Sequence, residues 1–178
     1  MDDVKQKQIV EYYKIIDPIL NSKEFQKKRE FKHHGDISLY EHSLKVSFKA
    51  YMIALKMKDV DPKRVAIGGL LHDFYSEPWP DKEEPFFSKE KHCFLHAHEA
   101  LINSQECFTE YMDDVVEDII EKHMYPINNI PPKYKESWLI TIVDKIVSLE
   151  VLKQPKFFKR NLGIKKTLEE KKNKILKK

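Results

Sequence analysis

Apolar residues recur at the spacing of an α-helix through most of this 178-residue sequence. Positions i, i+3, i+4 and i+7 share one face of a helix, whereas a strand alternates apolar and polar positions. In 38–58, this spacing places Leu44, Phe48, Tyr51 and Leu55 on one stripe. We predict helices at 4–20, around Phe25, at 38–58, from Asp61-Pro62 through the run VAIGGLLHDF, and at 92–104, 111–123, 136–152 and 164–176.

Glycine is scarce, with four residues in the whole chain. Sheets and hairpins rely on glycine in their turns, while helices joined by polar loops do not. The sequence therefore predicts an all-α fold, a single-domain helical bundle with one hydrophobic core. Gly68 and Gly69 lie inside an almost entirely apolar helix, so we expect a neighbouring helix to approach them closely. Three prolines predict that 76–88 is a loop.

Composition and charge indicate the cellular compartment and the kinds of partner that the protein can have. The two cysteines form no CxxC pair, the N-terminus is charged, and no apolar run approaches the ~20 residues that span a bilayer. We expect a cytoplasmic protein with no membrane partner. From Lys153 onward, eleven Lys or Arg residues stand against two Glu residues. This basic tail can attract nucleic acid, but a solvated terminal helix is the favoured interpretation.

A histidine and two aspartates fall where apolar residues are expected. His72 and Asp73 are adjacent near the end of a buried helix, and Asp144 lies within the apolar run WLITIVDKIVSLEV. Asp144 shares a face with Ile140 and other apolar residues, and the opposite stripe is apolar too. A carboxylate in such a helix needs a strong partner. A metal ion and a buried salt bridge are both candidates at this point.

Three more histidines occupy apolar positions on other predicted helices. His42 follows the capping box that Ser38 and Glu41 form, while His96 and His123 lie on the buried faces of their helices. Together with His72 they supply four imidazoles alongside the two carboxylates. This mixture suits Mn, Fe, Co, Ni or Zn, whereas Mg and Ca prefer more oxygen ligands.

The ordered series His42, His72-Asp73, Asp144 resembles the HD-domain metal-dependent phosphohydrolases. The contexts YEHSLKVSFKA, AIGGLLHDF and TIVDKIVSLE carry the resemblance, which spans roughly 31–152. It implies an HD-type metal-binding core at 31–152. An N-terminal helical extension at 1–30 would pack on this core, and a basic helical tail would follow at 153–178.

Two further motifs, HCFLHAHEAL and IIEKHMYP, are similar to those of the subset that binds two metals. The resemblance implies that His42, His72, Asp73 and Asp144 hold one divalent transition metal. It implies that His96 and His123 hold a second, with Asp73 bridging. His92 and His98 are alternative candidates for this ligand position of the second metal. His96 fits the family pattern better than either.

The resemblance also implies a phosphohydrolase, a phosphomonoesterase or phosphodiesterase that cleaves a nucleotide or other small phosphoester through a metal-activated hydroxide. Asp73 and Lys145 are the expected catalytic residues, and Lys145 and Trp79 the expected substrate contacts. Ser76 stands where several phosphodiesterase relatives have lysine and deoxynucleotidase relatives have glutamate, so no relative's substrate is carried over.

Two other functions remain as alternatives. A few HD-fold proteins with the same six ligands are mixed-valence di-iron oxygenases, and the ligand set alone does not separate them from hydrolases. The second alternative is a regulatory or nucleic-acid-binding module with a structural metal, in which the basic tail contacts phosphates.

Overall fold

The computed structural model describes residues 2–31, 37–75 and 89–153. This part of the chain is helical and contains no strand, which confirms the predicted all-α class. The predicted loop at 76–88, Trp79 and the predicted helix at 164–176 lie outside it. The helices are α1 (Asp2–Leu20), α2 (Lys23–Gln26), α3 (Leu39–Ala54), α4 (Pro62–Leu71), α5 (Lys89–Cys107), α6 (Asp114–Lys122) and α7 (Lys135–Lys153), with short 3-10 turns η1 (Lys27–Arg29) and η2 (Thr109–Tyr111).

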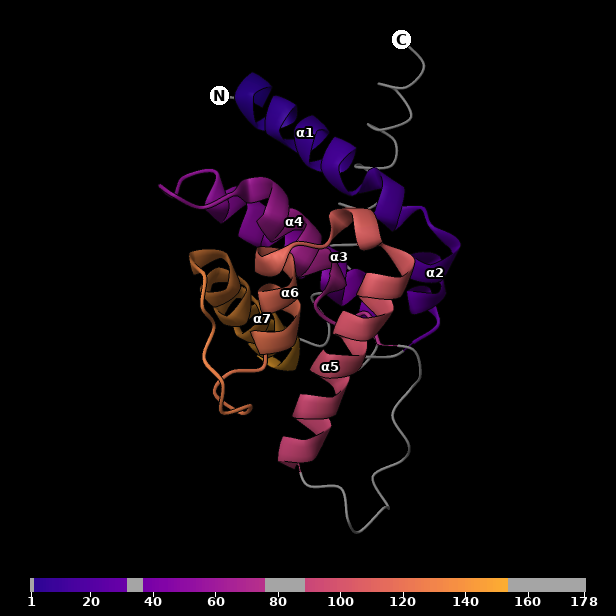
Figure 1. Ribbon diagram of the computed structural model, residues 1–178. Coiled ribbons are helices and arrows are strands. Elements are labelled where there is room, and N and C mark those ends of the chain that lie inside the picture. Colours follow the sequence, from indigo (N-terminus) through magenta and orange to yellow (C-terminus); the bar gives the residue numbers. More distant parts are fainter. Residues whose placement is uncertain (1, 32–36, 76–88, 154–178) are drawn as a thin grey trace.

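Helix α4 is the central element of the bundle. It packs against α1, α3, α5, α6 and α7, and α1 crosses the same bundle at one end (Figure 1). Every residue from Val65 to Leu71 is buried, as its apolar sequence predicts. Asp61 caps this helix by accepting a hydrogen bond from the Lys63 amide, and Pro62 occupies its first turn.

Both glycines of α4 allow close packing, as the sequence predicted. A Cβ atom on Gly68 would lie 2.7 Å from side-chain carbons of Ile119 in α6. A Cβ atom on Gly69 would lie 2.9 Å from the backbone Cα of Ser47 in α3 and 2.8 Å from Ile140 Cδ1 in α7. The helix therefore approaches three neighbours more closely than alanine would permit.

Several helix boundaries differ from the predicted ones: α4 ends at Leu71 instead of continuing to Phe74, and α5 is longer at both ends than the predicted 92–104. Helix α3 ends at Ala54, and Asp59 beyond it adopts φ 56°, the left-handed conformation that reverses the chain. Helix α6 begins at Asp114 because Asp113 accepts hydrogen bonds from the amides of Val115 and Val116. Among the described helices, none is both long and apolar enough to cross a bilayer.

Candidate metal centre

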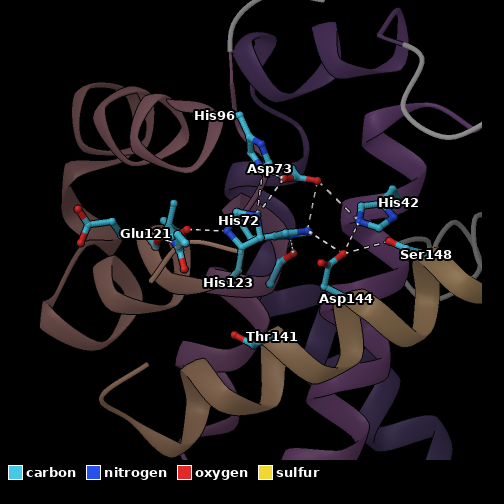
Figure 2. A network of polar contacts seen from close by, with 12 residues as sticks. His42, His72, Asp73, His96, Glu121, His123, Thr141, Asp144 and Ser148 are labelled. Carbon is cyan, nitrogen blue, oxygen red and sulfur yellow. Dashed lines mark hydrogen bonds and ion pairs between the residues drawn. The ribbon is translucent and has the colours of Figure 1, made fainter. Parts of the chain in front are cut away.

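Six histidine and aspartate side chains meet inside the bundle (Figure 2). Their relative exposures lie between 0% for His72 and 9% for Asp144. They come from α3 and α5, from the C-terminal ends of α4 and α6, and from α7: His42, His72, Asp73, His96, His123 and Asp144. Buried groups of this kind need hydrogen bonds, ion pairs or a metal to offset their desolvation.

A capping box sets the first turn of α3 and places His42. The Ser38 hydroxyl accepts a hydrogen bond from the Glu41 amide at 3.2 Å, and the Glu41 carboxylate accepts one from the Ser38 amide at 3.4 Å. This reciprocal pair satisfies two amides that the helix leaves free. His42 is the next residue, and it points from this first turn toward the centre.

His72 and His123 hold equivalent positions at the C-caps of α4 and α6. The Nδ1 atom of His72 lies 2.9 Å from the Gly69 carbonyl oxygen, and that of His123 lies 2.6 Å from the Ile120 carbonyl oxygen. A carbonyl oxygen can only accept, so both Nδ1 atoms carry a proton. The two Nε2 atoms then face the centre, an orientation that is usual for metal-binding imidazoles.

The first group of candidate ligands is His42, His72 and Asp144, with one ligand atom of each within 4.8 Å of the others. The distance from Asp144 Oδ1 is 3.0 Å to His42 Nε2 and 3.7 Å to His72 Nε2. His72 Nε2 is buried and forms no well-directed hydrogen bond, although Asp73 Oδ2 lies 3.4 Å away. A buried nitrogen that is poorly hydrogen-bonded and lies beside carboxylates fits a cation-binding site.

Asp73 joins this group to a second one, composed of Asp73, His96 and His123. Its Oδ1 atom lies 3.2 Å from His96 Nε2 and 3.3 Å from His123 Nε2. Its Oδ2 atom lies 3.4 Å from His72 Nε2 and 3.7 Å from His42 Nε2. One carboxylate thus presents a different oxygen to each pair of histidines (Figure 2).

The charges of the centre depend on one another. Burial raises the pKa of Asp144, but hydrogen bonds from His42 and His72 outweigh it and hold that pKa well below its usual value. Burial alone would lower the pKa of His72, yet Asp73 and Asp144 raise it to about 9. At His123 burial prevails, and the pKa is lowered despite Asp73. The two carboxylates thus favour a positive charge beside them, which a proton on His72 or a bound cation would supply.

Of the two predicted substrate contacts, Lys145 belongs to the described residues and Trp79 does not. The Lys145 ammonium group donates hydrogen bonds to the carbonyl oxygens of His123, at 3.1 Å, and Thr141, at 3.3 Å. It therefore lies at the C-terminal end of α6. Its role toward a substrate stays a prediction, as does that of Trp79, which lies outside the described residues.

The structure separates His96 from His98, one of the two alternative candidates. The side chain of His98 is 50% exposed and lies 3.9 Å from a Glu121 oxygen, away from the centre. The side chain of His92 lies outside the described part of the chain. Of these histidines, His96 is the one that contacts Asp73 and His123.

Two contacts to candidate ligands were not predicted from the sequence. Ser148, one turn after Asp144 in α7, has its hydroxyl 3.4 Å from Asp144 Oδ1, and its i+4 spacing was the available signal. The ring of Tyr75 lies 5.6 Å from that of His96, centroid to centroid. Phe74, next to Tyr75, is 3% exposed and stacks on Phe25 in the core.

Comparison with known families gives one match. A family model described as HD domain matches residues 39–149, more than half of the chain. The chain belongs to the HD-domain family. The matched residues include α3 to α6, most of α7 and all six side chains of the centre, while α1, α2 and η1 precede them. Neither the curated proteins nor the solved structures compared with the chain give a match.

Family membership agrees with the chemistry of the centre. HD-domain proteins bind divalent metals, and both groups of this centre combine imidazole nitrogens with carboxylate oxygens. The poorly hydrogen-bonded Nε2 of His72 and the divided contacts of Asp73 fit cations held between these residues.

Proposed function

We propose that this HD-domain protein is a metal-dependent phosphohydrolase that acts on a nucleotide or another small phosphoester. The position of Asp73 supports this most directly, because its two oxygens face different pairs of histidines. A carboxylate in this position can join two cations, and paired cations commonly serve displacement at phosphorus. The family match favours the same class of reaction.

In this proposal, two divalent ions are held by separate ligand sets. His42, His72, Asp73 and Asp144 would hold the first ion, and His96 and His123 would hold the second, with Asp73 bridging. When bound, such ions lower the pKa of a shared water and neutralise charge on phosphate oxygens. The Nδ1 hydrogen bonds of the two C-cap histidines keep their Nε2 atoms directed at the ions.

The ligand set also favours certain metals. Four imidazoles and two carboxylates suit Mn, Fe, Co, Ni or Zn better than Mg, which demands mainly oxygen ligands and keeps several waters. We therefore propose a transition-metal enzyme.

Lys145 and Trp79 are the proposed contacts for the substrate, with Lys145 also proposed as a catalytic residue. The Lys145 ammonium group holds two carbonyl oxygens, so a phosphate would have to draw it away from His123 O. The hydrogen bonds to the carbonyl oxygens are already charge-assisted, but a phosphate carries a full negative charge and so attracts the ammonium group more strongly than a neutral carbonyl does.

The proposal is tested by a panel of phosphomonoesters and phosphodiesters, including nucleotides, incubated with the metal-free protein and Mn, Fe, Co, Ni, Zn or Mg in turn. We expect phosphate or nucleotide release with one of the transition metals. Elemental analysis should find two equivalents of metal in the active protein.

Two results would contradict the proposal. Oxygen consumption coupled to turnover, with no phosphoester cleaved, would assign the protein to the oxygenases of this fold. Salt-dependent RNA or DNA binding without any turnover, lost on deletion of 165–178, would instead indicate a nucleic-acid-binding module.

A further inference from the structure

Lys28 is a buried lysine in η1, within the N-terminal segment that precedes the HD-domain match. Its relative exposure is 6%. The ammonium group donates a hydrogen bond to the backbone carbonyl oxygen of Tyr75. It also lies 4.5 Å from the ring centroid of Phe74 and 4.9 Å from that of Phe31. The ammonium group is therefore held between two aromatic rings and one backbone carbonyl oxygen.

This contact holds the backbone that directly follows the His-Asp pair. The Tyr75 carbonyl oxygen accepts from Lys28, and the preceding carbonyl, that of Phe74, accepts from Asn103 Nδ2 in α5 at 3.1 Å. The Phe74 amide donates to the Leu71 carbonyl oxygen at 3.0 Å. The two residues after Asp73 are thus fixed from both the N-terminal segment and α5.

Tyr75 connects this support to the second ligand group. Its ring lies 5.6 Å from the His96 ring, tilted by 60°, and it is 7% exposed. His96 in turn lies 3.2 Å from Asp73 Oδ1. A shift of the Tyr75 backbone would move a ring that packs on His96, a member of the second ligand group.

Keeping an ammonium group in such a place has a cost. Burial lowers the pKa of Lys28 to about 8, although Glu99 and Cys107 oppose the shift. An apolar side chain of similar length would fill the same space without this penalty. The hydrogen bond to Tyr75 is what an apolar side chain would not supply.

We propose that Lys28 is a positioning residue for the second ligand group, acting through the Tyr75 carbonyl to hold the Tyr75 ring against His96. The inference rests on the proposed two-metal centre. It assigns to the segment before the family match a part in metal binding, and it concerns the Asp73–His96–His123 group alone.

The test compares Lys28→Met and Lys28→Gln with Lys27→Met, which removes the same charge from an exposed neighbour in η1. Full-length proteins are dialysed against Mn²⁺ at known free concentrations, and the bound metal is measured. We expect Lys28→Met to weaken the second equivalent about tenfold or more, a usual effect of losing an outer contact to a ligand, and to leave the first unchanged. Lys27→Met should retain both affinities, and Lys28→Gln, which keeps a donor, should fall between.

Equal affinities in Lys28→Met and the wild type, or an equal loss at both equivalents, would overturn the inference. Far-UV circular dichroism checks folding, and if Lys28→Met is unfolded, Lys28→Gln is judged against Lys27→Met by the same criterion. A wild-type protein that binds no metal would contradict the proposed centre instead. The His96 ring resonances of the metal-free proteins then decide: Lys28→Met must shift them and Lys27→Met must not.

Discussion

His72 and His123, at the C-caps of α4 and α6, bring their ring centroids to within 5.0 Å of each other. The opposite ends of the same helices are also joined, because Arg64 of α4 donates to Asp113, the N-cap of α6, at 2.7 Å. Between these ends, Gly68 lets Ile119 pack directly on the α4 backbone. The geometry of the metal centre therefore depends on how α4 packs.

The packing of α4 predicts unequal effects of two glycine substitutions. Gly69→Ala would place a Cβ atom 2.9 Å from the Ser47 backbone, which cannot rotate away. Overpacking of this kind costs about 1–3 kcal/mol, and the gain in helix propensity offsets about 1 kcal/mol of it. Gly68→Ala meets only the Ile119 side chain, which can move. Urea unfolding should find Gly69→Ala the less stable of the two, and the reverse order would contradict this packing.

Single substitutions should remove the metals selectively. His72→Ala or Asp73→Ala is expected to abolish metal binding and activity together, because in the proposed centre both residues would hold the first ion and Asp73 would bridge the two. His96→Ala and His123→Ala should each remove one equivalent only. Elemental analysis of the purified variants measures this, with the exposed His98→Ala as the matched control for His96→Ala. Metal retained in both His72→Ala and Asp73→Ala would contradict the ligand assignment.

Asp113 predicts a loss of stability in acid. Burial raises its pKa, but hydrogen bonds from the Val116 amide and Arg64 together with the charge of Arg64 outweigh this and lower the pKa below its ordinary 3.8. A carboxylate with a lowered pKa stabilises the fold above its ordinary value, and this contribution disappears as pH falls through the folded-state pKa. Asp113→Asn keeps a capping side chain but removes the charge.

At pH 7, wild type should therefore exceed Asp113→Asn in unfolding free energy by about 0.5–1 kcal/mol, as expected for an exposed pair. The gap should close toward pH 2. A difference that stays constant over this range would show that the charge contributes nothing.

Lys28 predicts a slope of the same sign in alkali: stability again rises with pH. Its pKa is about 8 in the folded protein and ordinarily 10.5, so between these values the unfolded chain binds more protons than the folded one. Stability from this group therefore rises with pH from about 8 to about 10.5. The charged groups that act on it are Glu99, Cys107 and Lys27. Denaturant unfolding of wild type and Lys28→Met across this range should show the difference growing in favour of wild type, and a flat difference would be inconsistent with a buried ammonium group.

Helix type and several caps could be predicted because local chemistry decides them. The capping box of Ser38 and Glu41 and the N-cap of Asp61 are present as the sequence indicated. The end of α3 was misplaced because apolar Leu55 and Met57 continue the helical pattern, yet both are exposed beyond the last turn. Periodicity records which residues are apolar, and tertiary packing decides which of them are covered.

Periodicity alone is equally insufficient to predict the surroundings of Asp144. The apolar stripe opposite Asp144 in the sequence consists of Leu139, Val143, Ile146 and Leu149. Leu139 and Val143 are buried, whereas Ile146 and Leu149 are 41% and 53% exposed. Asp144 is nevertheless buried, because it lies on the inward face with Ile140 and Val147 as predicted.

Lys28 had no signal of its own in the sequence. It belongs to a short polar helical turn, where a lysine is ordinarily solvated. Its burial follows from contact with Tyr75, 47 positions away in the chain. A contact over this distance in the chain can be identified only from the three-dimensional packing of the N-terminal helices on the core.

The C-terminal ends of α4 and α6 meet at His72 and His123, and this arrangement affects the electrostatic potential of the site. Each helix carries partial negative charge at its C-terminal end, and here two such ends point at the same place as Asp73 and Asp144. The field at this spot attracts cations and repels a phosphate anion. In the proposed phosphohydrolase, cation binding would therefore come before phosphoester binding.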